Sequence, residues 1–377
     1  MGILGGILIP SIMHNIAFLG TIYINLLKFM IIPLIFTSIM VSVYNSNKGK
    51  SKLLFKTILL FIVMFVATFL LTSLVVWIIN PAKGFNYEIL KWAEEITPLN
   101  TSDIIINLFP SNIAGIIVNN SLFACIMVAF TFGIAATKTK DGKELIKFVD
   151  SFKNILVKVL EWIMYLSPIG IFALVGSSIA SSGTAIIGAG IRYIGIAYLC
   201  SILCLFLVMI LPVWLYAKIN PLTYIKKVGK VWLVTISTCS SLATLPYTIK
   251  TLKESFKVPS DVTDVVAPLG CTIHMCGGAV SFALLGLFCS SLFGVEITLT
   301  TYLIMIVSAT LINMAAPGIP SGGIILGATY LSMLNIPLLF IGFYSGIYRL
   351  LDMSYTTLNV TGDISAGLII NKNVGNK

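Results

Sequence analysis

Long apolar stretches separated by short polar segments make up most of this chain. Residues 16–43, 58–79, 122–136, 155–177 and 191–216 are apolar runs, and most of them reach the length of about 20 residues that a helix needs to cross a bilayer. Residues 2–9 are also apolar but too short to span, so we expect a truncated first helix. The pattern predicts an all-α polytopic membrane protein.

The C-terminal half interrupts this pattern in three places. Residues 229–256 have a Ser-rich interruption at 237–241, and lysines on both flanks indicate that the segment enters and leaves on one side. Residues 262–293 are broken by a glycine-rich, polar run at 270–278, and residues 299–337 by a Gly/Pro-rich run at 315–323. Irregular backbone at membrane depth must be covered by protein or line a cavity. We therefore expect two re-entrant helical hairpins, 229–256 and 299–337, in an inverted repeat of the kind that places a substrate near the midplane.

The last apolar segment carries a polar stripe. Asp352, Thr356, Asn359 and Asp363 lie at i, i+4, i+7 and i+11, which places them on one face of a helix. A carboxylate at membrane depth costs at least ~2.5 kcal/mol on insertion scales. Two carboxylates on one stripe therefore need a cation, a substrate amine or water, and the stripe predicts a binding site.

Composition and charge agree with a membrane location. The 377 residues are 58% hydrophobic and only 10% charged, against roughly 25% charged residues in soluble domains. The net charge of +10 comes mainly from lysines that are dispersed in short loops. Such lysines indicate the cytoplasmic loops of a multi-pass cell-membrane protein. They are not gathered on one face, so we expect no nucleic-acid partner. The seven cysteines lack the spacing of a disulfide framework, so we expect free thiols. The start lacks a basic n-region, so no cleavable signal is expected.

Four motifs in order carry a family resemblance. They are S-S-L-A-T-L-P at 240–246, P-L-G-C-T-I-H-M at 268–275, G-I-P-S-G-G at 318–323 and D-M-S-Y-T-T-L-N-V-T-G-D at 352–363. With them the chain resembles the dicarboxylate/amino acid:cation symporters, which include the glutamate transporters. The resemblance implies a transporter and not an enzyme, with about eight spans plus two hairpins, a homotrimer and no cofactor beyond coupling ions. It also implies an elevator, in which a transport part (51–82 and 185–377) moves against a scaffold (1–50 and 105–180).

The resemblance and the departures described next give a set of site residues. Asp352 matches the partner of a substrate ammonium, and Asn359 a contact to the substrate backbone. The substrate-binding set is Ser240, Ser241, Gly278, Ile319, Gly323, Arg349, Asp352, Tyr355, Thr356 and Asn359. One implied sodium site comprises Gly270, His274, Asn359 and Asp363, and a second comprises Thr272, Met275, Asn313, Met314 and Ala316. Such oxygen-rich sets suit hard cations.

The main departure concerns the substrate. Tyr355 stands where members with acidic substrates have an arginine, so the clamp for a side-chain carboxylate is missing from its usual place. A buried carboxylate without a charge partner is costly, so the departure favours a neutral or small amino acid. Arg349, one turn earlier, either replaces the clamp, which gives an acidic amino acid or dicarboxylate carrier, or pairs with Asp352 at i+3.

Further departures concern the cations. His274, Cys276 and Gly278 replace the family's asparagine, aspartate and threonine, and the hydroxyl-bearing positions of an additional sodium site are occupied by Phe61, Met64 and Phe65. We predict that this third site is absent. His274 contributes either its carbonyl and shape or an imidazole that carries a proton in place of a sodium, so the coupling ion is sodium or a proton.

Two hypotheses about other kinds of function remain open. The first is a soft-metal site, because thiol and imidazole ligands come together at Cys271, His274 and Cys276, although the resemblance explains this stretch without a metal. The short first span and the lost cation ligands also fit a channel-like or non-transporting membrane protein. The leading hypothesis is a cation-coupled secondary symporter for a neutral or small amino acid.

Overall fold

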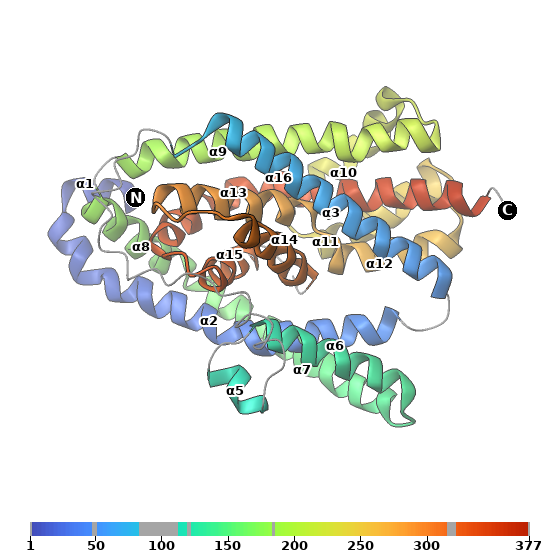
Figure 1. The fold of residues 1–377 in the computed structure, drawn as a ribbon, viewed down its shortest axis with the longest axis horizontal. Coiled ribbons are helices and arrows are strands. Elements are labelled where there is room, and N and C mark those ends of the chain that lie inside the picture. Colours follow the sequence, from blue (N-terminus) through green and yellow to red (C-terminus); the bar gives the residue numbers. More distant parts are fainter. Residues whose placement is uncertain are drawn as a thin grey trace.

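The computed structural model describes residues 2–46, 51–82, 112–118, 122–182, 185–314 and 322–375, which contain helices and no strands (Figure 1). The first half has α1 (Gly2–Leu8), α2 (Pro10–Ser46), α3 (Ser51–Ile79), α5 (Ile113–Val118), α6 (Leu122–Lys138), α7 (Gly142–Tyr165) and α8 (Ser167–Ser182). The second half has α9 (Ala185–Cys204), η2 (Leu205–Ile210), η3 (Val213–Ala217), α10 (Pro221–Thr238), α11 (Ser241–Lys250), η4 (Thr251–Ser255), α12 (Ser260–Ile273), α13 (Cys276–Leu292), α14 (Leu299–Met314), α15 (Gly322–Met333) and α16 (Leu339–Gly375). The predicted all-α class is confirmed.

The helices pack in two groups. The first group consists of α1, α2, α6, α7 and α8, and the second consists of α3 and α9 to α16. The two groups meet mainly where α16 packs on α8. In Figure 1, α2, α6 and α7 lie along one side and α9 along the other, with α13 to α16 between them. The face of α16 that bears Asp352, Thr356, Asn359 and Asp363 is buried, and so is most of the rest of the helix from Leu351 to Ile370. The polar stripe is therefore enclosed by protein and does not border on lipid.

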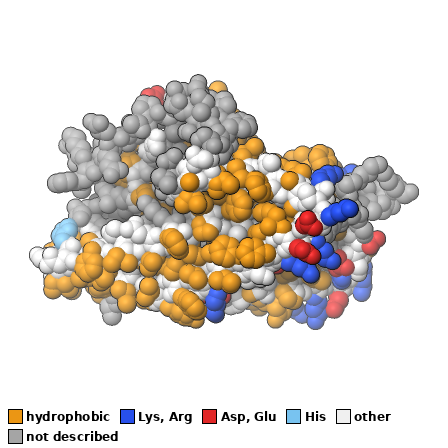
Figure 2. All heavy atoms as spheres, turned by 90° about the horizontal axis from the view of Figure 1, so that it is seen from below, with side chains coloured by type: hydrophobic (Ala, Val, Ile, Leu, Met, Phe, Trp, Pro, Cys, Tyr) orange, Lys and Arg blue, Asp and Glu red, His pale blue; other side chains and the backbone are white. Residues whose placement is uncertain are grey.

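The outer surface is apolar over long stretches. Figure 2 shows hydrophobic side chains over most of the described part of one face, with charged side chains gathered toward one end. Three helical stretches in the described residues are long and apolar enough to cross a membrane: Leu53–Ile79, Gly190–Ala217 and Ser260–Leu292. A fourth is the pair Gly142–Ile163 and Pro168–Ser177, if it counts as one span. The count of about eight spans stays a prediction.

The predicted span over residues 155–177 is not one continuous helix. The structure ends α7 at Tyr165, begins α8 at Ser167 and bends the chain by 58° between them. Pro168 lies in the first turn of α8, where its missing N–H costs no helical hydrogen bond, whereas inside a continuous helix it would break one. The apolar run continues across the bend, so hydropathy did not reveal it.

The first hairpin is built from α10 and α11. Asn220 caps α10 by accepting a hydrogen bond from the Leu222 N–H at 2.9 Å, and Pro221 follows at the first helical position. The hairpin arm thus begins before residue 229. At the tip, Cys239 takes a left-handed conformation (φ 50°), and the Ser240 hydroxyl caps α11 by accepting from the Ala243 N–H at 3.2 Å. The predicted Ser-rich tip is confirmed as a turn between two helices.

The interrupted span and the second hairpin follow. Helix α12 ends at Ile273 and α13 begins at Cys276, so only His274 and Met275 leave the helical conformation, fewer than the 270–278 run suggested. Helices α14 and α15 form the arms of the second hairpin. Its tip, with Ala316 and Ile319, lies outside the described residues.

Candidate functional site

A cavity of about 50 Å³ lies where α13, α14, α15 and α16 meet the tip of the first hairpin. Sequence-predicted residues that line it are Ser241, Met275, Gly278, Asn313, Gly323, Tyr355, Thr356 and Asn359. The structure thus brings together residues that are separated by up to 118 positions in the chain. Gly322, from the 318–323 motif, also lines it, and further lining residues that the sequence did not single out are Cys239, Ser281, Phe282, Leu326 and Tyr348.

Asp352 lies beside this cavity and is 6% exposed. Its Oδ1 accepts a hydrogen bond from Thr356 Oγ1 at 3.1 Å, so the threonine connects the carboxylate to the cavity wall. Asn359, one turn further along α16, is 7% exposed and lines the cavity directly. A carboxylate, a hydroxyl and an amide therefore follow one another along the buried stripe.

Arg349 does not take the position of a carboxylate clamp. Its side chain is exposed, and Nη2 donates to the carbonyl oxygen of Ser237 at 3.0 Å, at the end of α10. Arg349 does not line the cavity. Its guanidinium reaches across to the first hairpin.

Tyr355 and its neighbours form an aromatic wall. Tyr355 is 2% exposed, and its hydroxyl interacts with that of Tyr193 but makes no hydrogen bond of full geometry among the described residues. The Tyr348 ring lies 6.4 Å from the Tyr355 ring, centroid to centroid, and the Tyr344 hydroxyl shares a 2.7 Å hydrogen bond with Ser281 Oγ. No lysine or arginine is among the described residues that line the cavity.

Two of the missed lining residues had a signal in the sequence. Tyr348 precedes Asp352 by four residues and so extends the polar stripe by one turn, and Ser281 follows Gly278 by three on α13. Each of the two lies on the same helix face as a residue that the sequence analysis had already assigned to the site. Phe282 and Leu326 carried no signal beyond apolarity, and only the packing of α13 against α15 brings them to the cavity.

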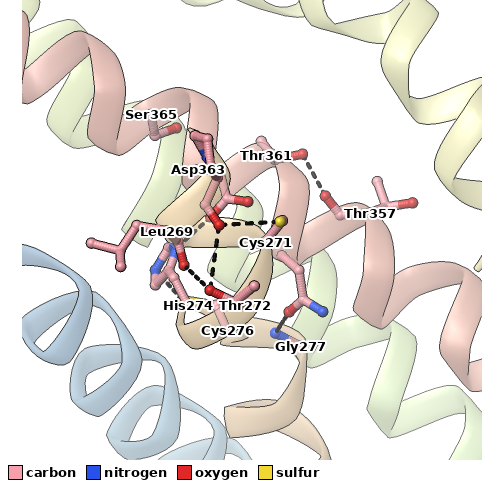
Figure 3. A network of polar contacts seen from close by, with 12 residues as sticks. Leu269, Cys271, Thr272, His274, Cys276, Gly277, Thr357, Thr361, Asp363 and Ser365 are labelled. Carbon is pink, nitrogen blue, oxygen red and sulfur yellow. Dashed lines mark hydrogen bonds and ion pairs between the residues drawn. The ribbon is translucent and has the colours of Figure 1, made fainter. Parts of the chain in front are cut away.

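At the other end of the stripe, Asp363 is bonded to His274. Asp363 Oδ1 and His274 Nδ1 are 2.9 Å apart, and both side chains are 1% exposed or less (Figure 3). His274 Nε2 lies 3.0 Å from Cys276 Sγ, and the Phe61 ring stacks on the imidazole at a centroid distance of 4.2 Å with 9° between planes. Both ring nitrogens and one ring face of His274 are thus engaged by the protein.

Gly270 permits the close approach of Asp363. A Cβ at this position would collide with the carboxylate, so a larger residue would displace it. Asn359 Oδ1 accepts from the Gly277 N–H at 2.6 Å, which satisfies one of the free backbone donors at the start of α13. The structure therefore brings Gly270, His274, Asn359 and Asp363 to one region of α12, α13 and α16.

The second predicted cation set is only partly within the described residues. Asn313 is 3% exposed, and its amide, oriented with Nδ2 toward the Met275 carbonyl, pairs with both backbone groups of Met275 at 3.0 and 3.3 Å. Thr272 Oγ1 donates back to the Leu269 carbonyl at 2.9 Å. Ala316 and the Met314 side chain lie outside the described part of the chain.

The described residues contain no group of three or more His, Cys, Asp or Glu side chains arranged to hold a metal ion. Cys271, which the soft-metal reading required, instead has its thiol 3.2 Å from the Pro268 carbonyl oxygen. The seven cysteines are free, as predicted, and all of them are buried. The His274 cluster is therefore a hydrogen-bonded pair with a neighbouring thiol.

Comparison with known proteins identifies the family. A proton/glutamate-aspartate symporter of Bacillus subtilis (strain 168) is 24% identical over 365 residues, covering 94% of this chain and 87% of that protein. A proton/sodium-glutamate symport protein of the same organism is 24% identical over 380 residues, covering 96% and 87%. Neutral amino acid transporter B(0) of Mus musculus is 30% identical over 259 residues, covering 66% of this chain and 46% of that protein.

The family model for sodium:dicarboxylate symporters matches residues 1–373, nearly the whole chain. This match marks a membrane transporter and not an enzyme, and the apolar helices and the enclosed polar stripe agree with it. The chain belongs to the sodium:dicarboxylate symporter family.

Proposed function

We propose that the protein is a cation-coupled secondary symporter for a neutral or small amino acid. The observation that carries the proposal is Tyr355, which lines the cavity where a carboxylate clamp would need an arginine. A substrate carboxylate beyond the α-carboxylate would lose its hydration here without gaining a charged partner, at a cost of several kcal/mol. A small uncharged side chain avoids that cost and fits the small cavity.

The substrate is held mainly through its backbone groups. Asp352, linked to the cavity by Thr356, binds the ammonium, and Asn359 contacts the substrate backbone. Ser240, Ser241 and the tip of the second hairpin, with Ile319 and Gly323, close over the α-carboxylate. Helix N-termini offer free N–H groups to an anion, and α11 begins at Ser241.

An acidic amino acid is the second candidate, because two relatives named above are glutamate symporters. It requires Arg349 to leave the Ser237 carbonyl and turn toward the cavity. Because Arg349 already bonds to the first hairpin and lies outside the cavity, the neutral substrate needs no rearrangement and is preferred.

The coupling ion is sodium, with a proton as the alternative. Asp363, Asn359 and the carbonyls of Gly270 and His274 supply one site, and Thr272, Met275, Asn313, Met314 and Ala316 supply the second. The stacking of Phe61 on His274 supports the absence of a third site, because apolar rings replace its hydroxyl ligands. Transport proceeds as an elevator in a homotrimer, in which residues 51–82 and 185–377 move against 1–50 and 105–180.

Uptake of radiolabelled amino acids into proteoliposomes tests the proposal. Alanine and serine should enter at least about tenfold faster than aspartate or glutamate, and an imposed sodium or pH gradient should drive that uptake. Arg349→Ala should leave the preference unchanged, while Tyr355→Arg should shift it toward aspartate. Preferred aspartate uptake by the wild type, lost in Arg349→Ala, would establish the acidic alternative. Uptake or binding that responds to neither gradient would point to a channel-like or non-transporting protein.

A further inference from the structure

Side-chain hydrogen bonds fasten the first hairpin to α16 along the length of α10. In the first part of α10, the Tyr224 hydroxyl donates to the Thr361 carbonyl at 3.2 Å. Further along, the Trp232 indole N–H donates to Thr361 Oγ1 at 2.9 Å, and the hydroxyls of Thr235 and Thr357 share a hydrogen bond of 2.7 Å. These contacts between neutral groups hold the body of α10 on α16.

A charged contact continues this series at the end of α10. Arg349 Nη2 donates to the Ser237 carbonyl at 3.0 Å. The last four carbonyls of a helix lack partners within the helix, and an arginine beside them satisfies a carbonyl and complements the negative end of the helix dipole. Helix α10 has no basic residue in its own last turn, so α16 supplies the cation. The contact reaches the hairpin two residues before Cys239, where the tip turns.

This contact joins two walls of the cavity. On the hairpin side, Cys239 and Ser241 follow Ser237 closely in the chain and line the cavity. On the α16 side, Arg349 precedes Asp352 by three residues, which is less than one helical turn. The Cys239 thiol is close enough to both the guanidinium and the Asp352 carboxylate to interact electrostatically with each. The hydrogen bond from Arg349 therefore connects the hairpin tip to the turn of α16 that bears Asp352.

An amino acid needs these two walls at a fixed separation. Its ammonium and its α-carboxylate are attached to one carbon atom, whereas their proposed contacts come from different elements: Asp352 from α16, and Ser240 and Ser241 from the hairpin tip. Binding groups must be held within about 0.5 Å of the productive geometry to act together. A contact that fixes the tip relative to Asp352 therefore contributes to affinity without touching the substrate.

We propose that Arg349 is a positioning residue for substrate binding. Its hydrogen bond to the Ser237 carbonyl holds the tip of the first hairpin at the distance from Asp352 at which one amino acid contacts both. The inference rests on the proposed function, because it takes Asp352 and the hairpin tip as the two ends of the substrate site. Arg349 acts on the affinity for the backbone groups of an amino acid and not on the choice of its side chain.

Uptake kinetics in proteoliposomes test this role. Arg349→Ala should raise the KM for alanine and for serine alike by about tenfold, the loss expected for a hydrogen bond to a charged group, while the maximal rate changes by less than about twofold. Arg349→Lys keeps a cationic donor and should restore the KM to within about threefold of the wild type. In the matched control, Lys227→Gln, the wild-type lysine also donates to a backbone carbonyl, that of Ser255 at 2.6 Å, but at the base of the hairpin. This control should leave the KM unchanged.

The native thiol of Cys239 reports the position of the tip without any transport. Cys239 is 1% exposed, so its alkylation by N-ethylmaleimide, followed by peptide mass spectrometry without substrate, should be slow in the wild type and in Lys227→Gln. In Arg349→Ala it should be about tenfold faster, because the tip opens more often.

Equal alkylation of Cys239 in Arg349→Ala and the wild type, or an equal increase in Lys227→Gln, would overturn the proposal. So would a KM increase confined to aspartate, which would make Arg349 a direct contact of a side-chain carboxylate. A wild type that takes up neither alanine nor serine, with alkylation as expected, would instead refute the proposed function while supporting the hold of Arg349 on the tip.

Discussion

The two halves of the polar stripe on α16 are both buried but differently surrounded. Asp352 is 6% exposed and Asp363 is 1% exposed. Beside Asp352 lies a cavity lined by residues of α13, α14, α15 and the first hairpin, and the carboxylate reaches it through Thr356. Around Asp363 the space is filled by the imidazole of His274, which is itself covered by Phe61.

Burial alone therefore does not tell a ligand site from a structural pair. Both carboxylates would be costly without a partner. Asp363 has the imidazole of His274 2.9 Å away, and Asp352 accepts a hydrogen bond from the Thr356 hydroxyl beside the cavity. The Asp352 half has the space that a substrate ammonium needs. The Asp363 half can admit a cation only if the ion shares the carboxylate with His274. The following changes test this difference.

The largest effect is expected from Asp352→Asn. It removes the charge that we propose binds the ammonium and keeps the shape, so uptake of alanine into proteoliposomes should fall by about 100-fold, in line with the loss of one partner of a buried charge pair. Asp150→Asn, which removes only a half-exposed ion pair to Lys153 on α7, is the control and should retain uptake. Uptake that survives Asp352→Asn would move the ammonium site elsewhere.

Asp363→Asn should act on the cation and not on the substrate. A neutral amide is a weaker ligand for a hard cation, so the cation concentration for half-maximal uptake should rise about tenfold or more. The measurement is uptake as a function of sodium at fixed pH and of pH without sodium. If both curves coincide with those of the wild type, Asp363 is a structural partner of His274 only.

Gly270→Ala probes the packing around Asp363. The new methyl group collides with the carboxylate, so we expect a loss of about 1–3 kcal/mol in stability, seen as a lower Tm. Gly229→Ala is the matched control, because nothing lies near its Cβ position within α10 and alanine favours a helix by up to about 1 kcal/mol. Equal Tm values for the two variants would show that Asp363 has room to move.

Tyr355→Phe should have the smallest effect. Its hydroxyl makes no hydrogen bond of full geometry among the described residues. Its removal should therefore change the free energies of unfolding and of alanine binding, measured through the Tm and the KM for alanine, by less than about 0.5 kcal/mol each. Tyr344→Phe, which breaks a 2.7 Å hydrogen bond to Ser281, should cost about 1 kcal/mol. A larger loss of alanine binding in Tyr355→Phe than in Tyr344→Phe would place the Tyr355 hydroxyl on the substrate.

Local signals predicted the elements of the site better than its contacts. Helical spacing predicted the stripe from Asp352 to Asp363, and the Ser-rich run predicted the hairpin tip, because each depends on neighbours in sequence. The pairing of His274 with Asp363 joins residues 89 positions apart, and the turn of Arg349 toward Ser237 depends on where α10 ends. The bend before Ser167 was missed because apolarity continues through it, although Pro168 indicated a helix start.

Calorimetric titration of amino acids into the purified protein, with and without sodium, tests the central claim most directly. The account predicts that alanine or serine binds with an affinity that rises with the coupling cation, that aspartate binds at least about tenfold more weakly, and that Asp352→Asn abolishes the signal. Aspartate binding as tightly as alanine, or alanine binding unaffected by Asp352→Asn, would contradict it.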